Sequence, residues 1–133
     1  LRLINKGFYK EQDKKLFLTT IIWGLEKIAD EYKLICLNLV NNKKIINKEI
    51  LKVYQEVNEF FNFYYELIYQ FSPEKLNELT DKKEELIKKI NLLNPQTKQE
   101  SELVKGLSTI VSKTSDLSSS IIALNHEKLK QFR

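Results

Sequence analysis

The sequence predicts an all-α fold: an antiparallel up-down bundle of about four helices, forming a single domain over residues 1–133. Apolar residues recur at alternating spacings of three and four, which is the period of one face of an α-helix. Only three Gly and two Pro occur, fewer than the many turns of an all-β fold require. Hydrophobic residues make up 42% of the chain, enough to fill one core beneath a charged surface.

The first predicted helix covers residues of about 11–41. Its apolar stripe consists of Leu18, Ile21, Leu25, Ile28, Tyr32, Ile35 and Leu39. We expect Ile22, Ala29 and Cys36 to widen the buried face on one flank. Residues 1–10 contain Gly7, for which a hinge and the end of a preceding helix both remain open interpretations.

Three further helices are predicted over residues of about 46–71, 73–93 and 97–128. Ser72 followed by Pro73 predicts an N-cap and a first helical residue. Thr97 and Glu100 match a capping box at the start of the last helix. The connections between these helices are short, which favours antiparallel neighbours in an up-down arrangement.

Charge and cysteine content argue against several classes of partner and location. The 22 basic and 18 acidic residues give a net charge of +4 and are interspersed, so we expect no nucleic-acid-binding face. Cys36 is alone and cannot form an internal disulfide, which favours the cytoplasm. We expect no membrane span, because no apolar run is long enough. Since the chain begins at Leu1 rather than Met, we expect a fragment or a trimmed end.

The residues that most enzymes need are missing from the pattern. His126 is the only histidine, and Cys36 lies on a different predicted helix, where it is expected to be buried. A Cys-His nucleophile and a zinc site of His and Cys are therefore unsupported, and no phosphate-binding Gly-rich loop occurs. We predict that the chain is not an enzyme.

Two acids on the first helix form a candidate metal site. Glu26 and Asp30 are spaced i, i+4, which places both carboxylates on one helix face. This face points away from the apolar stripe. Two carboxylates on an exposed ridge bind a cation when another helix supplies a third oxygen ligand. The alternative is that both acids are simply solvated.

Three aromatic residues are candidate partner-binding residues. Trp23, the only tryptophan, lies one turn before Glu26 and is expected to face outward. Exposed large aromatics are enriched at protein contacts. Tyr65 and Tyr69 fall outside the core stripe of the second helix and predict a further patch. We expect a homodimer that forms through Trp23 or through this tyrosine patch. The alternatives are partial burial of Trp23 and a core wide enough to include both tyrosines.

The stretch Leu25-Glu26-Lys27-Ile28-Ala29-Asp30 resembles the helical signature of the PhoU family of phosphate-uptake regulators, Leu-Glu-Arg-Ile-Gly/Ala-Asp. In that family the acidic element recurs in a second, related helix. Its counterpart here ends at Asp116, 86 residues after Asp30, with Ser112 in the place of the first acid. By this resemblance the chain covers the last helix of one three-helix repeat and the whole of the next.

The resemblance implies a function and a ligand set. It implies a cytoplasmic negative regulator of phosphate uptake and signalling that binds a phosphate transporter subunit and a sensor kinase. It also implies a surface metal ion, divalent or ferric (Zn, Mn, Mg or Fe), held by Glu26, Asp30 and Asp116. The two motif helices should then be adjacent. The alternative is a metal-free helical interaction or dimerisation module of an unrelated family.

Overall fold

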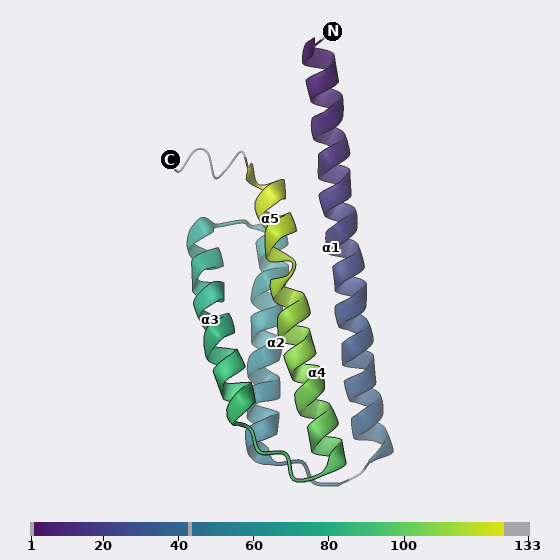
Figure 1. Cartoon of the computed structure of the whole chain (residues 1–133), viewed down its shortest axis with the longest axis vertical. Coiled ribbons are helices and arrows are strands. Elements are labelled where there is room, and N and C mark those ends of the chain that lie inside the picture. The colour runs from purple at the N-terminus through teal and green to yellow at the C-terminus, as the bar shows by residue number, and fades with distance from the viewer. Residues whose placement is uncertain (1, 43, 127–133) are drawn as a thin grey trace.

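The protein is an all-α bundle, as the sequence predicts (Figure 1). The computed structural model describes the backbone of residues 2–42 and 44–126, and the side chains of this part from residue 11 onward. Its helices are α1 (Arg2–Asn41), α2 (Lys48–Tyr69), α3 (Pro73–Leu92), α4 (Lys98–Ser115) and α5 (Ser118–Leu124). Because α4 and α5 follow one another along one line, they act together as the fourth helix of the bundle.

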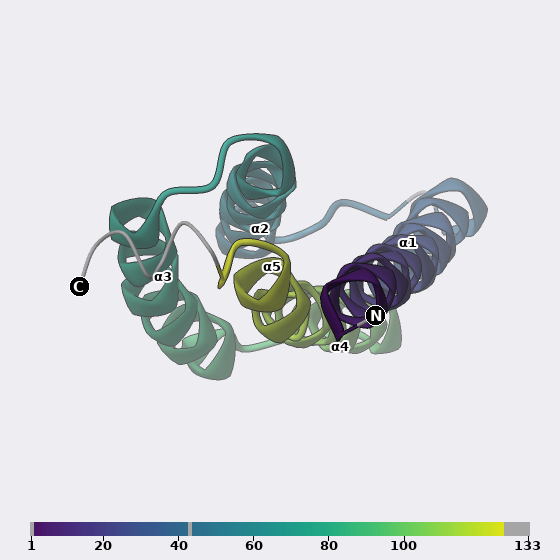
Figure 2. The same ribbon diagram turned by 90° about the horizontal axis from the view of Figure 1, so that it is seen from above.

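Successive long helices run in opposite directions, which confirms the up-down topology (Figure 1). The packing is not a symmetric square. α1 packs against α4 and α5, α2 packs against α3 and α4, and α3 packs against α4. Seen from above, α4 and α5 lie between α1 and α3 (Figure 2). α1 and α2 make fewer backbone contacts than the helix pairs named above, so the bundle is more open on that side.

One apolar core joins the helices. Each helix contributes buried side chains, among them Ile28 of α1, Phe60 of α2, Leu86 of α3, Leu107 of α4 and Ile121 of α5. These are positions that the three-and-four spacing predicts for inward-facing residues. None of the described helices combines the length and the apolar character needed to cross a membrane.

The predicted helix starts are confirmed at two places. The Ser72 side chain accepts a hydrogen bond from Lys75 N, and Pro73 is the first residue of α3. Thr97 Oγ1 accepts a hydrogen bond from Glu100 N at the start of α4. Both side chains satisfy backbone donors that the first turn of a helix leaves free.

Glu100 also joins two connections at the same end of the bundle. The residue as a whole is only 5% exposed; Oε1 accepts from Gln96 N at 2.9 Å and Oε2 accepts from Asn47 N at 2.8 Å. Gln96 precedes α4, and Asn47 is the N-cap of α2. These backbone hydrogen bonds lower the pKa of Glu100, because they favour its charged form. A single side chain therefore links the starts of α2 and α4.

Two helix boundaries differ from the prediction. α1 begins at Arg2 and runs through Gly7 without a hinge. The fourth predicted helix is interrupted at Asp116 and Leu117, where Leu117 N donates to Thr114 O three residues back. Nearby, Ser115 Oγ donates to Ser112 O, and such side-chain bonds compete with helical backbone bonds. The predicted end of that helix, near residue 128, lies outside the described residues.

The predicted flank of α1 is also corrected. Ile22, Ala29 and Cys36 are exposed rather than buried, and Leu18 is 46% exposed. The reason is the separation of α1 from α2, which leaves this flank without a neighbouring backbone along the described chain. Helical spacing predicts which residues share a face, but it does not predict how many neighbours cover that face.

Candidate functional site on α1

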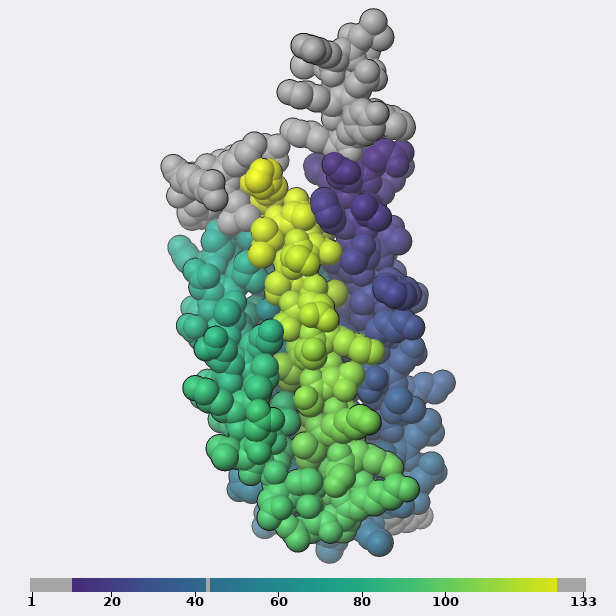
Figure 3. Space-filling view, in the orientation of Figure 1, coloured from purple at the N-terminus to yellow at the C-terminus, as the bar shows by residue number. Residues whose placement is uncertain are grey.

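The helices that carry the two signature-like stretches lie side by side. α1 runs along α4 and α5, which fill the space between α1 and α3 (Figure 3). A Cβ built on Gly24 of α1 would stand 2.7 Å from Leu117 Cδ2. A Cβ built on Gly106 of α4 would stand 3.1 Å from Ile35 Cγ1 of α1. Each helix thus contributes one glycine to the close approach.

Polar side chains line the edge of this contact. Lys113 Nζ of α4 lies 3.7 Å from Glu31 Oε1 of α1. Asn38 Nδ2 donates to Glu102 Oε2 at 3.1 Å, and Gln99 Nε2 donates to Asn42 O at 2.8 Å. These pairs fix the lengthwise position of α1 against α4, because each bond requires its two partners to be level.

The three predicted metal-binding acids are all exposed. Glu26 and Asp30 face outward on α1, as their spacing predicts, and Asp116 is the C-cap residue of α4. They therefore belong to helices that touch. Within the described residues, however, no three or more His, Cys, Asp or Glu side chains are grouped so as to hold a metal ion. An ion at Glu26, Asp30 and Asp116 stays a prediction.

Trp23 lies on the outer surface of α1, one turn before Glu26. Trp23 is 62% exposed, which confirms that it faces outward. It is therefore not partly buried against a neighbouring helix of the described chain. Lys27 Nζ lies 5.4 Å from the centre of the indole ring, which is a cation–π contact. Trp23, Glu26 and Asp30 together form an outward-facing ridge, which we call the α1 ridge.

Tyr65 and Tyr69 form an exposed aromatic pair near the end of α2. Their exposed fractions are 43% and 70%, which confirms that they lie outside the core. Their rings meet edge to face, and their hydroxyls share a hydrogen bond of 3.2 Å. That hydrogen bond raises the pKa of Tyr69. The pair is an ordered, amphipathic surface of the kind common at protein contacts.

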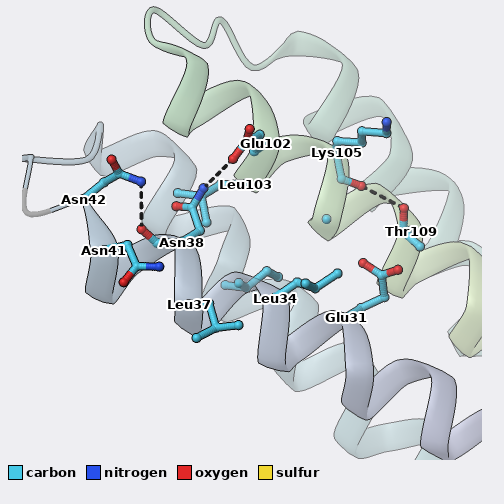
Figure 4. A pocket seen from close by; sticks show the side chains of 12 residues that line it. Glu31, Leu34, Leu37, Asn38, Asn41, Asn42, Glu102, Leu103, Lys105 and Thr109 are labelled. Carbon is cyan, nitrogen blue, oxygen red and sulfur yellow. Dashed lines mark hydrogen bonds between the residues drawn. The ribbon is translucent and has the colours of Figure 1, made fainter.

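A groove lies between α1 and α4, and the sequence analysis did not predict it (Figure 4). Its volume is about 510 Å³, and its lining includes Leu34, Leu37, Asn38, Glu102 and Lys105. Leu34 is 60% exposed, although it is a large apolar residue. The signal was present in the sequence, since residues 34–40 are apolar on every side of the helix except at position 38. A helix segment with apolar residues on every face is normally packed against other elements on every face.

Aromatic side chains bridge the space between α1 and α2. Tyr32 donates its hydroxyl proton to Asn58 Oδ1 at 2.7 Å, and its ring lies edge-on to Phe61 with centroids 6.0 Å apart. Burial, followed by the neighbouring Tyr54 hydroxyl, raises the pKa of Tyr32 to about 12. The bridge holds the two helices together while it keeps their backbones apart.

Most of the large apolar and aromatic side chains that are exposed on the described surface thus lie on α1 and α2. No protein-family model, curated protein or solved structure matches the chain.

Proposed function

We propose that the chain is a PhoU-like regulator of phosphate uptake and signalling that acts by binding other proteins. One observation carries the proposal: α1 lies against α4 and α5. These helices hold two stretches that are 86 residues apart and that resemble one family signature. Gly24, just before the first stretch, meets Leu117, just after the second.

The exposed α1 ridge supports binding as the mode of action. Trp23 offers a large amphipathic contact surface, and Glu26 and Asp30 place two carboxylates beside it. Exposed aromatics at the centre of an interface contribute a large share of binding energy. The proposed partners are a phosphate transporter subunit and a sensor kinase in the cytoplasm, and the proposed ligand of the three acids is a divalent or ferric ion.

Partner binding tests the proposal directly. The transporter subunit and the sensor kinase, both purified, are passed over the immobilised chain and over Trp23→Ala. We expect the wild type to retain at least one partner and Trp23→Ala to weaken this binding tenfold or more, the effect of losing an aromatic hot spot. Leu92→Ala, at an exposed apolar residue on α3, is the matched control and should bind normally. Binding of neither partner by the wild type contradicts the proposal.

The metal ion is tested separately by calorimetric titration with Zn, Mn, Mg and ferric ions. We expect heat of binding for one of them with the wild type, and none with the double variant Glu26→Ala, Asp30→Ala. The exposed i, i+4 pair Glu74 and Glu78 on α3 supplies the control double variant, which should bind as the wild type does. The same small signal from all three proteins would show that no specific site exists.

The second candidate function is a metal-free helical interaction module. The exposed Tyr65 and Tyr69 pair favours it, because this surface lies on α2 and has no part in the three-acid arrangement. A protein that self-associates, gives no heat with any of the four ions and binds neither proposed partner would favour this candidate.

A further inference from the structure

α1 carries a second apolar stripe, distinct from the one in the core. We call it the outer stripe, and it consists of Leu18, Ile22, Ala29, Cys36 and Val40. All five residues are exposed, Ile22 to 57% and Val40 to 69%. Their spacings are four, seven, seven and four, with the half-buried Leu25 and Tyr32 along one edge. A seven-residue apolar repeat is the pattern of a surface that packs against another helix.

Nothing within the described residues supplies that helix. The core stripe of α1 faces α4 and α5. On this side α1 also contacts them through Gly24, which lies against Leu117, and through the Glu31–Lys113 ion pair. On the other side, the Tyr32–Asn58 bridge holds α2 at a distance. The outer stripe lies beyond this bridge, on the open side of the bundle.

We propose that a second copy of this chain covers the outer stripe, with the two α1 helices antiparallel and the two-fold axis beside Ala29. The stripe is symmetric about this residue, since Ile22 and Cys36 each lie seven residues from it, and Leu18 and Val40 each lie eleven. In an antiparallel pair Ile22 therefore meets the partner's Cys36, and Leu18 meets the partner's Val40. At the centre the two Ala29 methyl groups allow the helices to approach closely.

Charges beside the outer stripe favour the same arrangement. Glu26 and Lys33 are exposed on the edge of the stripe away from Leu25 and Tyr32, three residues before Ala29 and four residues after it. In the antiparallel pair this edge faces its own counterpart. Glu26 then lies opposite residue 32 of the partner, one position from the partner's Lys33. The two-fold symmetry forms the same pair of opposite charges a second time. In a parallel pair the same edge would face Leu25 and Tyr32 of the partner, which offer no opposite charge.

The outer stripe also sets the expected strength of association. From Leu18 to Val40 the contact is about 33 Å long at a rise of 1.5 Å per residue. A contact along one helix of each copy buries an area at the low end of the range for stable protein–protein interfaces. We therefore expect a reversible dimer whose measured mass rises with concentration. The proposal does not rest on a role in phosphate regulation, and either can fail without the other.

Disulfide trapping tests the arrangement, because Cys36 is the only cysteine of the chain. In the antiparallel pair the two Cys36 lie 14 residues apart along the helices, or about 21 Å. A disulfide needs Cα atoms within about 7 Å, so the oxidised wild type should stay uncrosslinked. Ile22→Cys should crosslink to the partner's Cys36. Ala29→Cys combined with Cys36→Ala should crosslink to its own copy across the axis.

The matched control is Glu84→Cys combined with Cys36→Ala, which moves the thiol to an exposed site on α3 and should not crosslink. Crosslinking of the wild type through Cys36 would show a parallel pair and overturn the proposal, and so would the absence of crosslinking at position 29. Equal crosslinking at positions 29 and 84 would show random collision and also overturn it.

Light scattering over a range of concentrations gives an independent answer. We expect the wild-type mass to approach twice the 15.8 kDa of one chain, and Ile22→Glu to remain at 15.8 kDa with unchanged helix content. Leu34→Glu is the matched control, since Leu34 is equally exposed but lies on the α4 side of α1. It should still dimerise. A wild type of 15.8 kDa at every concentration, or a dimer lost only in Leu34→Glu, would overturn the proposal.

Discussion

Gly24 of α1 lies directly against Leu117, the residue at which α4 gives way to α5: a Cβ at position 24 would stand 2.7 Å from Leu117 Cδ2. Leu117 is buried, so it has little room to move aside. The contact brings the start of the Glu26–Asp30 stretch level with Asp116, the neighbour of Leu117. This approach is one of the contacts that place both signature-like stretches on one side of the bundle.

A larger side chain at position 24 should loosen the contact. We expect Gly24→Val to lower the free energy of unfolding by about 1–3 kcal/mol, the usual cost of overpacking, less any gain in helix propensity. Urea denaturation followed by circular dichroism measures it. Ser108→Val, at an exposed position of α4, is the control and should change stability little. Equal stability of Gly24→Val and the wild type would show that α1 does not pack here.

Glu100 should make the stability depend on pH in the acidic range. Its pKa in the folded protein is below the ordinary 4.5, because backbone donors of Gln96 and Asn47 favour the carboxylate. The stabilisation is therefore complete above pH 4.5 and is lost as the pH falls through the folded-state pKa. Glu100→Gln should melt at a lower temperature than the wild type at neutral pH, and the difference should shrink on acidification. A difference that stayed constant with pH would contradict this assignment.

The buried Tyr64 hydroxyl ties α2 to α5. It shares a hydrogen bond of 2.8 Å with Ser118 Oγ, and the tyrosine is 1% exposed. Tyr64→Phe should lower the free energy of unfolding by about 0.5–1.5 kcal/mol, the usual net value of one hydrogen bond. With Ser118→Ala and the double variant it forms a double-mutant cycle. A coupling energy of zero would mean that the two hydroxyls do not interact.

Tyr32 should be among the last tyrosines to ionise. Burial raises its pKa to about 12, whereas the ordinary value is 10. Absorbance at alkaline pH should show one phenol that titrates near pH 12 in the folded protein and is missing from Tyr32→Phe. The stabilisation from this group is complete below pH 10 and is lost as the pH rises through 12. If the phenol missing from Tyr32→Phe titrated near pH 10 instead of near pH 12, Tyr32 would lie in solvent.

Much of this fold follows from the sequence, because helical spacing and end signals act locally. Ile21, Ile28 and Ile35 are buried where the three-and-four spacing places them. Ser72 and Thr97 cap the helices that they were expected to cap. The exposure of Trp23, Tyr65 and Tyr69 also followed from their positions relative to the stripes.

The remaining features depend on tertiary distances that spacing does not encode. Ile22 and Cys36 have the sequence pattern of core residues, yet they are exposed because few backbone contacts join α1 and α2. The groove beside Leu34 has the same origin, since a pattern of apolar residues does not say which of them has a neighbour. The interruption at Asp116 is accompanied by a local hydrogen bond from Ser115 Oγ to Ser112 O, which the apolar spacing of this helix does not reveal.

The initial rate of phosphate uptake by cells is the decisive measurement for the proposed regulatory role. Initial uptake of radiolabelled phosphate is measured in cells that lack the chain, and again after they receive the wild type, Trp23→Ala or the control Leu92→Ala. A negative regulator acting through the α1 ridge predicts faster uptake without the chain. The wild type and Leu92→Ala should return uptake to normal, and Trp23→Ala should not. Unchanged uptake in cells that lack the chain would contradict the account.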